Sequence, residues 1–487
     1  MVVTISATIA SSLTLVDVSE AVTFIMKDIA KQVREFMERE DIKAQFEADL
    51  ASIISIPSVS EKGEGKYVFG ENCARVLDTT LAIGEKYGFK PENHDYYCGS
   101  LVYGEGEKEI GIVSHLDVVP CGGGWSVEPY ALTVKDGLYI GRGTEDDKGP
   151  MLISMYAIRF LMEKGYSLPF AVRMILGCDE EVGSTDLRHF ASVREVPDFS
   201  FTPDSGFPVC IGEKGIFSFG ILLGKKPANI LEIGGGTASN SVADSAYCVV
   251  KTDVTPNIKE GITVENMGDT LRITATGKGA HASLPENSLS AVKLLCEYLV
   301  ENDIADTEGL RFLAKACSEY KGKIFGIDKE DKDFGYLTCI CGLLGEKEGD
   351  LWANFNVRYI PYVPYEEIIA TVKQTAESYG FTAYSGGCSE GYIMSSDDPR
   401  IQALTDSCRD IIEEDCSPYT MGGGTYARYM KNTVAFGATI SAYRGLLGEG
   451  KGGAHERDEY ISREEVIRAA QIFVLSLLRL KKVYSGN

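Results

Sequence analysis

Residues 111–149 read GIVSHLDVVPCGGGWSVEPYALTVKDGLYIGRGTEDDKG. The run begins with apolar residues and stops at His115 and Asp117, a pattern that indicates a buried strand with polar side chains at its exit. Ligands of open parallel sheets bind outside the carboxyl ends of the strands, and residues two apart in an extended chain share one face. The sequence therefore predicts that His115 and Asp117 lie where chemistry usually takes place.

Further along the same stretch, Asp146 and Asp147 stand just before a predicted helix whose first turn carries Pro150. Each of these motifs has an ordinary explanation when it is taken alone. A single histidine is more often a satisfied core or surface residue than a ligand, and acidic residues are common at helix N-termini for capping and dipole reasons. Only recurrence of the pattern favours a site.

Two more strand-like runs end in acidic residues. Residues 169–178 lead into Glu180 and Glu181, and residues 198–203 lead into Asp204. If these strands are parallel neighbours of the first one, their ends converge, and the like charges repel unless a cation neutralises them. Imidazole and carboxylate ligands without a thiolate suit one or two zinc ions, with manganese or cobalt as substitutes.

A further candidate ligand, His455, lies in the glycine-rich segment GKGGAHERDEYI at residues 450–461. Glycines let such a loop bend toward a distant site, although a solvated loop histidine is the ordinary alternative. HERDE is not the HExxH motif of a helical zinc protease, so the sequence does not predict that kind of site.

Several motifs together resemble one known family. They occur in the order HLDVVP, GWSVEPY, GRGTEDDKGP, GCDEEVGS, TPDSGFP with GEKG, GKGAHASLPE, GGGTYAR and HERDEYI. They resemble the co-catalytic zinc exopeptidases and amidohydrolases that include carboxypeptidase G, aminoacylase and desuccinylases, and within these the branch of bacterial dipeptidase V and the Xaa-His dipeptidases. The resemblance runs from about residue 50 to the C-terminus.

The resemblance implies a site with two divalent metal ions, most simply Zn²⁺. Asp146 would bridge the ions, and the remaining ligands would be His115 and Asp204 on one ion and Glu181 and His455 on the other. Asp117 would orient His115, because ligating imidazoles usually donate their second N–H to a carboxylate. The general base would be Glu180, and the peptide bond between Asp146 and Asp147 is expected to be cis.

The resemblance also implies roles for residues that lie further along the chain. His281 would stabilise the oxyanion, and Arg358 would bind the C-terminal carboxylate of the substrate, facing backbone N–H groups of Gly422, Gly423 and Gly424. Asn240 carries over less well, because Ala243 replaces the usual proline of its motif. The ordinary alternatives are that Arg358 is a surface arginine on an exposed strand and that the segment from Gly422 to Gly424 is only a turn. GGGTYAR lacks the Lys and Ser/Thr of a phosphate-binding loop.

Composition excludes some classes of function. The 487 residues exceed what one hydrophobic core usually serves, and the net charge of −23 argues against nucleic acid or an anionic membrane as partner. The thirteen cysteines include no CxxC pair and fit a reducing cytoplasm, so Cys339 and Cys341 are expected to be packing groups. No segment is long and apolar enough to cross a bilayer.

We expect an α/β fold in which a three-layer catalytic domain with a mostly parallel central sheet is interrupted by an inserted α+β lid domain. Residues 1–217 and 386–487 would form the catalytic domain and residues 218–385 the insert. Periodicity and turn residues predict the following elements: helices at 19–39, 41–54, 67–87, 288–301, 365–379 and 398–414, antiparallel strands at 270–276 and 352–359, and a terminal helix from Ser462 with a capping box.

The opening residues are rich in Ser, Thr and Val and lack the basic region of a signal peptide, since the first basic residue is Lys27. Export is therefore not expected. The helix at 19–39 is amphipathic but carries both acidic and basic residues, so packing on the body of the protein is favoured over binding to a membrane surface.

Three classes of function remain open from the sequence. The leading one is a two-metal dipeptidase acting on Xaa-His or a broader range of dipeptides, the second is an N-acyl amino acid deacylase or desuccinylase, and the third is a binding protein without activity. The long insert, with a helical segment around 307–317, resembles the branch in which the extra part of the lid stands in for a partner subunit. His281 would then act within its own chain, and a monomer is expected.

Overall fold

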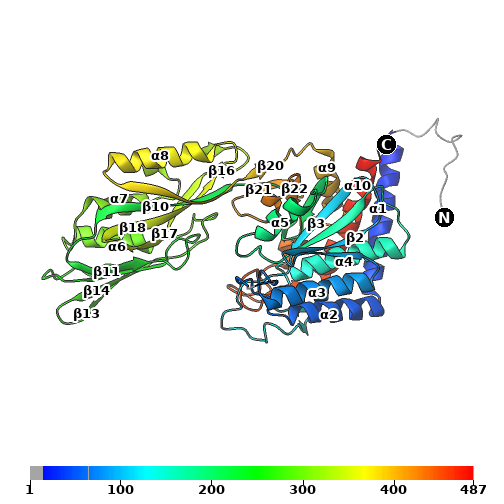
Figure 1. Cartoon of the computed structure of the whole chain (residues 1–487), viewed down its shortest axis with the longest axis horizontal. Helices are drawn as coiled ribbons and strands as arrows, with labels where there is room; N and C mark the ends of the chain where they lie inside the picture. Colours follow the sequence, from blue (N-terminus) through cyan, green and yellow to red (C-terminus); the bar gives the residue numbers. More distant parts are fainter. Residues whose placement is uncertain (1–14, 64, 486–487) are drawn as a thin grey trace. The chain divides into compact units, whose positions relative to one another are not determined.

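A computed structural model describes residues 15–63 and 65–485 of the chain (Figure 1). The expectation about a signal peptide falls on residues 1–14, which lie outside the described residues. The chain divides into two compact units, which are Met1–Ile211 with Met394–Tyr419 and Thr425–Asn487, and Gly212–Ile393 with Thr420–Gly424. The second unit starts before the expected limit of 218 and ends after 385, because its strands β10 (Gly215–Lys225) and β19 (Thr382–Ser389) extend past both limits.

The first unit is built on a central sheet. Among the described residues nine strands join it, in the order β1-β2-β6-β3-β7-β22-β9-β20, with β21 paired to β9. They are β1 (Lys90–His94), β2 (Cys98–Tyr103), β6 (Ala171–Gly177), β3 (Glu109–His115), β7 (Phe199–Thr202), β22 (Thr433–Ala435), β9 (Cys210–Glu213), β20 (Tyr392–Ile393) and β21 (Tyr419–Met421). The strands β6, β3, β7 and β22 are parallel, and antiparallel strands flank them on both sides. The predicted runs at 169–178 and 198–203 are thus β6 and β7, both parallel neighbours of β3.

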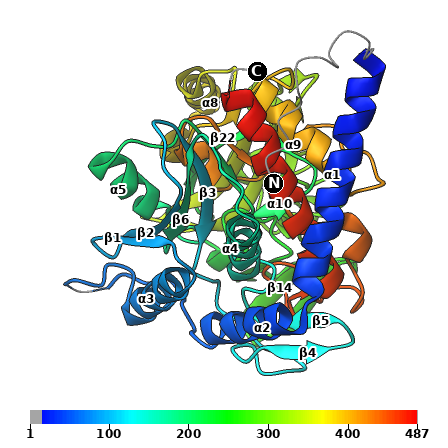
Figure 2. The ribbon, with the colours of Figure 1, turned by 90° about the vertical axis from the view of Figure 1, so that its right-hand side faces the viewer.

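Helices cover both faces of this sheet. They are α1 (Leu15–Glu38), α2 (Glu40–Ile54), α3 (Glu71–Lys86), α4 (Lys148–Glu163), α5 (Thr185–Val193), α9 (Pro399–Arg409) and α10 (Arg463–Tyr484). Figure 2 shows α5 on one side of β3 and β6 and α4 on the other. Leu187 and Phe190 of α5 pack against Val113 and Ile175 of the sheet. The three-layer arrangement expected from the sequence is therefore confirmed.

Short strands and turns outside the central sheet complete the first unit. The first unit also contains the short strands β4 (Thr133–Lys135), β5 (Leu138–Ile140), β24 (Tyr460–Ser462), β8 (Ser205–Gly206) and β23 (Ala438–Thr439), and the 3₁₀ turns η2 (Tyr426–Tyr429) and η3 (Ser441–Tyr443). Ser462 and Glu465 form the predicted capping box at the start of α10. None of the helices in the described ranges combines the length and the apolarity that a bilayer crossing needs.

Helix α1 confirms the predicted amphipathic helix only in part. In its C-terminal half one face is buried, through Ile29, Ala30, Val33, Phe36 and Met37, and Ala30 accepts a hydrogen bond from Gln471 of α10 through its carbonyl oxygen. Phe24 and Ile25, which lie nearer its start, are 75% and 53% exposed. The helix therefore packs on the first unit through its second half.

The second unit is an antiparallel sheet with helices on one face. In the described part of the chain the strand order is β13-β14-β12-β11-β17-β18-β10-β19. Besides β10 and β19 the elements are β11 (Ile230–Gly235), β12 (Ser245–Val250), β13 (Ile262–Asn266), β14 (Leu271–Thr276), β17 (Thr338–Lys347), β18 (Asp350–Tyr359), α6 (Ala291–Glu301), α7 (Glu308–Ala316) and α8 (Tyr365–Ser378), with the short β15 (Glu330–Asp331), β16 (Gly335–Tyr336) and η1 (Lys323–Phe325).

Alternation along β18 separates the two faces of this sheet. Ala353, Phe355 and Val357 are buried in the core with residues of α6, α7 and α8. The residues between them, among them Asn356 and Arg358, point to the opposite face because side chains alternate along a strand. The predicted helical segment at 307–317 is α7, and it packs into this core rather than on the surface. Cys339 and Cys341 are buried in the same core, as predicted.

Candidate metal centre

His115 is the last residue of β3, and its side chain is fully buried. Its Nδ1 lies 2.9 Å from the backbone oxygen of Asp117. A carbonyl oxygen can only accept, so Nδ1 carries a proton and Nε2 is the nitrogen turned toward the site. Nε2 lies 2.9 Å from Asp146 Oδ1 and 3.8 Å from Asp204 Oδ2.

Asp146 faces a different imidazole with each of its oxygens. Oδ1 contacts His115 Nε2, whereas Oδ2 lies 3.0 Å from His455 Nε2. His455 Nε2 is also 3.0 Å from Glu181 Oε1. Asp146 thus lies between two groups of potential ligands, which is the position that a bridging carboxylate requires. The peptide bond between Asp146 and Asp147 is cis, as expected.

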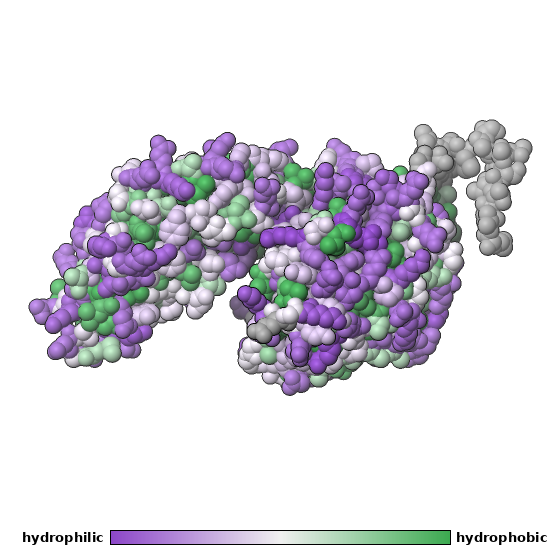
Figure 3. Space-filling model, in the orientation of Figure 1, coloured by the Kyte–Doolittle hydropathy of each residue, from purple (hydrophilic) through white to green (hydrophobic). Residues whose placement is uncertain are grey.

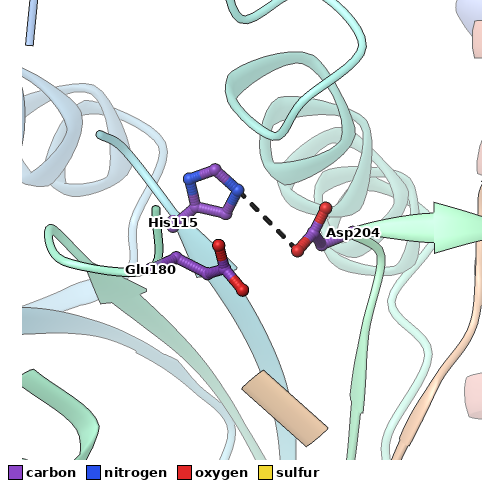
Figure 4. Close-up of side chains that lie close together, drawn as sticks. All are labelled: His115, Glu180 and Asp204. Carbon is purple, nitrogen blue, oxygen red and sulfur yellow. Dashed lines mark ion pairs between the residues drawn. The ribbon is translucent and has the colours of Figure 1, made fainter. Parts of the chain in front are cut away.

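Figure 4 shows the other side of the cluster, where His115, Glu180 and Asp204 converge from the ends of three strands. Their potential ligand atoms lie within 4.8 Å of one another, and so do those of His115, Asp146 and Glu181. The candidates that the sequence placed at the ends of these strands therefore lie close together at one edge of the sheet. Glu180 was expected to be the general base. Its carboxylate is close enough to the potential ligand atoms of His115 and Asp204 to share a metal ion with them.

Asp117 acts mainly on the neighbouring loop. Its Oδ1 is 3.5 Å from His115 Nδ1, farther than its own backbone oxygen. Its two carboxylate oxygens accept hydrogen bonds from the backbone N–H groups of Glu180 and Glu181, both at 3.2 Å. Asp117 therefore orients His115 through its backbone and holds the turn that carries the two glutamates through its side chain.

The cluster has more acidic groups than basic ones. Burial and the charge of Asp204 raise the pKa of the Glu180 carboxyl well above its usual range, and burial together with Asp146 raises that of Asp204 to about 7. Hydrogen bonds that the His455 imidazole donates to the carboxylates of Asp146 and Glu181 raise the pKa of His455 to about 11. Buried Asp147 adds a fifth carboxyl group, and its Oδ1 has no hydrogen-bond partner among the described residues.

This donor set fits divalent cations. Carboxylates that repel one another and imidazoles held by carboxylates are the usual ligands of zinc and of manganese. Positive charge at the site would relieve the repulsion that raises the carboxyl pKa values. The residues present therefore suit metal ions, and no thiol takes part among the described residues.

Glu459 lies beside the candidate ligands, although its position in the sequence predicted no role for it. Its carboxylate is fully buried, contacts Arg142 Nη1 at 2.5 Å, and accepts hydrogen bonds from the backbone N–H groups of Gly143, Glu145 and Asp146 at 3.0, 2.9 and 3.1 Å. It thereby fixes the loop that carries Asp146. The motif HERDEYI contains Glu459, but only the pairing of β24 with β5 brings it to this loop.

Lys148 supports the same loop from the other side. The side chain is fully buried, and its Nζ donates to the backbone oxygens of Ile53 and Ile56 at 3.0 and 2.9 Å. Burial lowers the pKa of Lys148 to about 7. Its two acceptors are at the C-terminal end of α2, where a cation is favourable for the unsatisfied carbonyl groups.

The loop that carries His455 is held in an unusual conformation. His455 has φ 64°, in the left-handed region that few non-glycine residues adopt. Its side chain is 56% exposed, in contrast to buried His115. Such backbone conformations persist where surrounding contacts impose them and are frequent at functional sites.

The remaining candidates lie together in the second unit. Asn240 accepts a hydrogen bond from the backbone N–H of Ala282, and His281 Nδ1 lies 2.7 Å from Ser283 Oγ. A cavity of about 550 Å³ is lined by residues that include His281, Gly422 and Gly423.

Arg358 lies beside this cavity. Its Nε donates to Asn356 Oδ1 at 2.9 Å, and its Nη1 donates to the backbone oxygen of Gly422 at 3.2 Å. Gly422 thus turns its carbonyl oxygen toward Arg358, where the sequence analysis expected N–H groups of Gly422 to Gly424. Arg358 is 4% exposed, so it is not the surface arginine that was the alternative.

Comparisons with known proteins agree with these features. A family model described as Peptidase family M20/M25/M40 matches residues 111–479. A Bacillus subtilis (strain 168) protein named "Putative dipeptidase YtjP" is 30% identical over 473 residues, covering 93% of this chain and 99% of the relative.

Solved structures show the same fold. Human carnosine dipeptidase 1 matches with a TM-score of 0.57 at 15% identity, over 93% of this chain and 99% of that chain. Aminoacylhistidine dipeptidase from Vibrio alginolyticus matches with a TM-score of 0.55 at 13% identity, over 92% and 98%. With the family match and the cluster of potential metal ligands, the chain is a member of peptidase family M20/M25/M40, a hydrolase of the metallopeptidase class.

Proposed function

We propose that this protein is a two-metal dipeptidase that hydrolyses the peptide bond of short peptides with free ends. The observation that carries the proposal is the position of Asp146, which faces His115 with one oxygen and His455 with the other. The "Putative dipeptidase" relative and the two dipeptidases of known structure support the same substrate class.

Two divalent ions, most simply Zn²⁺, would be held by this set. His115 and Asp204 would bind one ion, Glu181 and His455 the other, and Asp146 both. Bound ions would supply Lewis-acid polarisation of the scissile carbonyl and would lower the pKa of a water molecule at the site. The loop contacts of Asp117 and Glu459 keep these side chains in place before ions bind.

Glu180 is the proposed proton carrier. In the metal-free protein its pKa is raised by burial and by the acidic residues around it. Cations in the cluster would lower this pKa and leave a carboxylate that accepts a proton from the attacking water. The carboxyl group then donates that proton to the nitrogen of the leaving amine, and the peptide C–N bond breaks.

Residues of the second unit are proposed to serve the same reaction. His281 would donate a hydrogen bond to the developing oxyanion, and Arg358 would bind the C-terminal carboxylate of the substrate. Asn240 contacts Ala282, the residue after His281, and Gly422 contacts Arg358. Asn240 and the segment from Gly422 to Gly424 are therefore proposed to contact the substrate as well. The contacts of Arg358 with Asn356 and Gly422 fix the orientation of its guanidinium group.

Hydrolysis of a substrate panel tests the proposal. Dipeptides including β-alanyl-histidine would be compared with N-acetyl and N-succinyl amino acids, with metal content measured on the same sample. We expect dipeptide hydrolysis and two metal equivalents per chain. Preferential cleavage of the N-acyl substrates would replace the dipeptidase by a deacylase, and a metal-free protein that binds ligands without turnover would indicate a binding protein.

Compartment and assembly are part of the proposal. All thirteen cysteines lie in the described residues as free thiols, which favours a reducing compartment such as the cytoplasm.

We propose a monomer in which His281 acts within its own chain. Figure 3 shows hydrophobic residues over the end of the second unit that carries the edge strand β13. Val264 of this strand is 38% exposed, and Met267, directly after it, is 58% exposed. Pairing of this edge with a second copy, measured by light scattering, would contradict the monomer.

A further inference from the structure

A second buried cation borders the cavity of the second unit. Lys214 stands between β9 and β10 and is only 6% exposed, although lysine is rarely buried. Its Nζ donates to the backbone oxygen of Tyr336 at 2.5 Å, and its backbone N–H donates to Met421. Lys214, Tyr336 and Met421 all line the cavity of about 550 Å³. The ammonium group is thus held at the wall of a space large enough for a small ligand.

Lys214 and Arg358 lie close together in the second unit. Ile216 of β10 pairs with Arg358 of β18, so both side chains point to the same side. Lys214 precedes the first residue of β10 and is close enough to Arg358 for the charge of the guanidinium group to act on it. Thr338 of β17 pairs with Arg358 from the other side and also lines the cavity.

The two cations disfavour each other's charge. Burial lowers the pKa of Lys214 to about 8, the charge of Arg358 acts in the same direction, and Glu286 acts against it. Glu286 is exposed, and its Oε1 accepts a hydrogen bond from the hydroxyl group of Tyr336. Burial has the largest effect on this pKa, and the opposing effect of Glu286 is larger than that of Arg358.

We propose that Lys214 is a substrate-binding residue that, with Arg358, forms a site for a carboxylate group. The group would be either the C-terminal carboxylate of the substrate or an acidic side chain on its C-terminal residue. A carboxylate beside two buried ammonium and guanidinium groups forms charge-assisted hydrogen bonds, which are stronger than neutral ones. The identity of the substrate as a peptide rests on the proposed function, whereas the binding of a carboxylate does not.

A purely structural role for Lys214 is the alternative, because its ammonium group already contacts the Tyr336 carbonyl. Two variants separate these roles. Lys214→Met keeps the length of the side chain and removes the charge, while Lys214→Arg keeps the charge. Lys321→Met is the matched control, since Lys321 Nζ lies 4.1 Å from the centre of the Tyr336 ring but Lys321 does not line the cavity.

Equilibrium binding tests the proposal with small ligands of known chemistry. On a Glu180→Gln background, calorimetry would compare glycyl-glutamate with glycyl-glutamine, N-acetyl-glutamate with N-acetyl-glutamine, and glycyl-glutamine with its C-terminal amide. We expect Lys214→Met to weaken binding of the carboxylate ligands about tenfold to hundredfold, and Lys214→Arg to weaken it less. A loss confined to the glutamate ligands identifies the side chain as the group bound, and an equal loss for both members of the first pair identifies the C-terminal carboxylate.

A spectroscopic readout completes the test. The lysines would be reductively methylated with ¹³C-formaldehyde, and the Lys214 signal assigned by its absence from the Lys214→Met protein. Saturating glycyl-glutamate should raise the pH midpoint of this signal, because a bound carboxylate favours the charged form. Equal affinities in wild type and Lys214→Met, an unmoved midpoint, or no carboxylate binding at all would overturn the proposal. Loss of dipeptide hydrolysis alone would contradict the proposed function and leave this inference standing if N-acetyl-glutamate still binds through Lys214.

Discussion

The metal centre of the first unit and the cavity of the second unit have opposite charge imbalances. The metal centre gathers five carboxyl groups around two imidazoles: Asp146, Asp147, Glu180, Glu181 and Asp204 around His115 and His455. In the second unit, buried Lys214 lines the cavity, and buried Arg358 contacts Gly422 of the cavity lining through its Nη1. Buried like charges are unfavourable without a ligand of opposite sign, so the first region indicates a cation and the second an anion.

The largest effect is expected from removing the carboxylate between the two imidazoles. Asp146→Ala should lose at least one metal equivalent, because both proposed ions share that side chain. Activity should fall by more than the about 10²- to 10⁴-fold that a proton carrier contributes. Elemental analysis of the purified variant is the measurement, and full occupancy would refute the bridging assignment.

Glu180→Gln should separate proton transfer from metal binding. We expect the metal content to stay near that of the wild type and kcat to fall by about two to four powers of ten, because glutamine cannot accept the proton. Steady-state kinetics and metal analysis on one sample check this. Glu107→Gln, the same change at an exposed position, is the control. An active Glu180→Gln enzyme would transfer the role of the base to another residue.

Glu459→Gln should lower the affinity for metal ions although Glu459 is not itself a proposed metal ligand. It removes the charge that faces buried Arg142, and breaking such a pair typically costs about 3–5 kcal/mol of stability. The affinity for metal should fall about 10- to 100-fold, as for other residues that orient ligands. Competition with a chelator and denaturant unfolding measure the two effects. Glu464→Gln, in a partly exposed ion pair with Arg34, should change neither appreciably; metal affinity equal to that of the wild type in Glu459→Gln would count against the role of Glu459.

A smaller effect is expected in the second unit from Arg358→Lys. Lysine keeps the charge but lacks the planar fork that contacts Asn356 and Gly422 and binds a carboxylate in two places. KM for dipeptides should rise about tenfold while kcat and metal content change little. A change confined to kcat would mean that Arg358 does not act in substrate binding.

The convergence of the candidate ligands could be predicted from the sequence, whereas the burial of Lys214 beside the cavity could not, for a physical reason. His115, Glu180 and Asp204 each follow an apolar run, and the end of a buried strand is recognisable from a few consecutive residues. The capping box of α10 is equally local. Once β3, β6 and β7 are parallel neighbours, the convergence of these residues follows from the sheet alone.

Residues that act through long-range contacts left no such pattern. Glu459 contacts the loop at Gly143 only because β24 pairs with β5. The Asp117 carboxylate accepts hydrogen bonds from the backbone N–H groups of Glu180 and Glu181, which follow a different strand, β6. The burial of Lys214 depends on β10, β18 and the segment at Met421 meeting in space. A charged residue in a sequence looks the same whether it is solvated or buried, so these roles needed the structure.

The smallest expected effect concerns the pH dependence of local stability in the metal-free protein, and its sign should differ between the two regions. Burial raises the pKa of Asp204 from 3.8 to about 7 and that of Glu145 from 4.5 to about 8, so the folded metal centre binds protons that the unfolded chain releases. Its stability should therefore fall as the pH rises from about 4 to about 8, by at most about 1.4 kcal/mol per pH unit for each group.

Lys214 is the reverse case, because its pKa falls from 10.5 to about 8 in the folded protein. Around Lys214 stability should rise as the pH increases from about 8 to 10.5, since there the unfolded chain binds the extra proton. Hydrogen exchange of peptides from the two regions, corrected for the intrinsic rate at each pH, measures both slopes in the presence of a chelator. Adding zinc should remove the slope at the metal centre and leave the slope around Lys214 unchanged, and slopes of one sign in both regions would contradict the opposite charge imbalances.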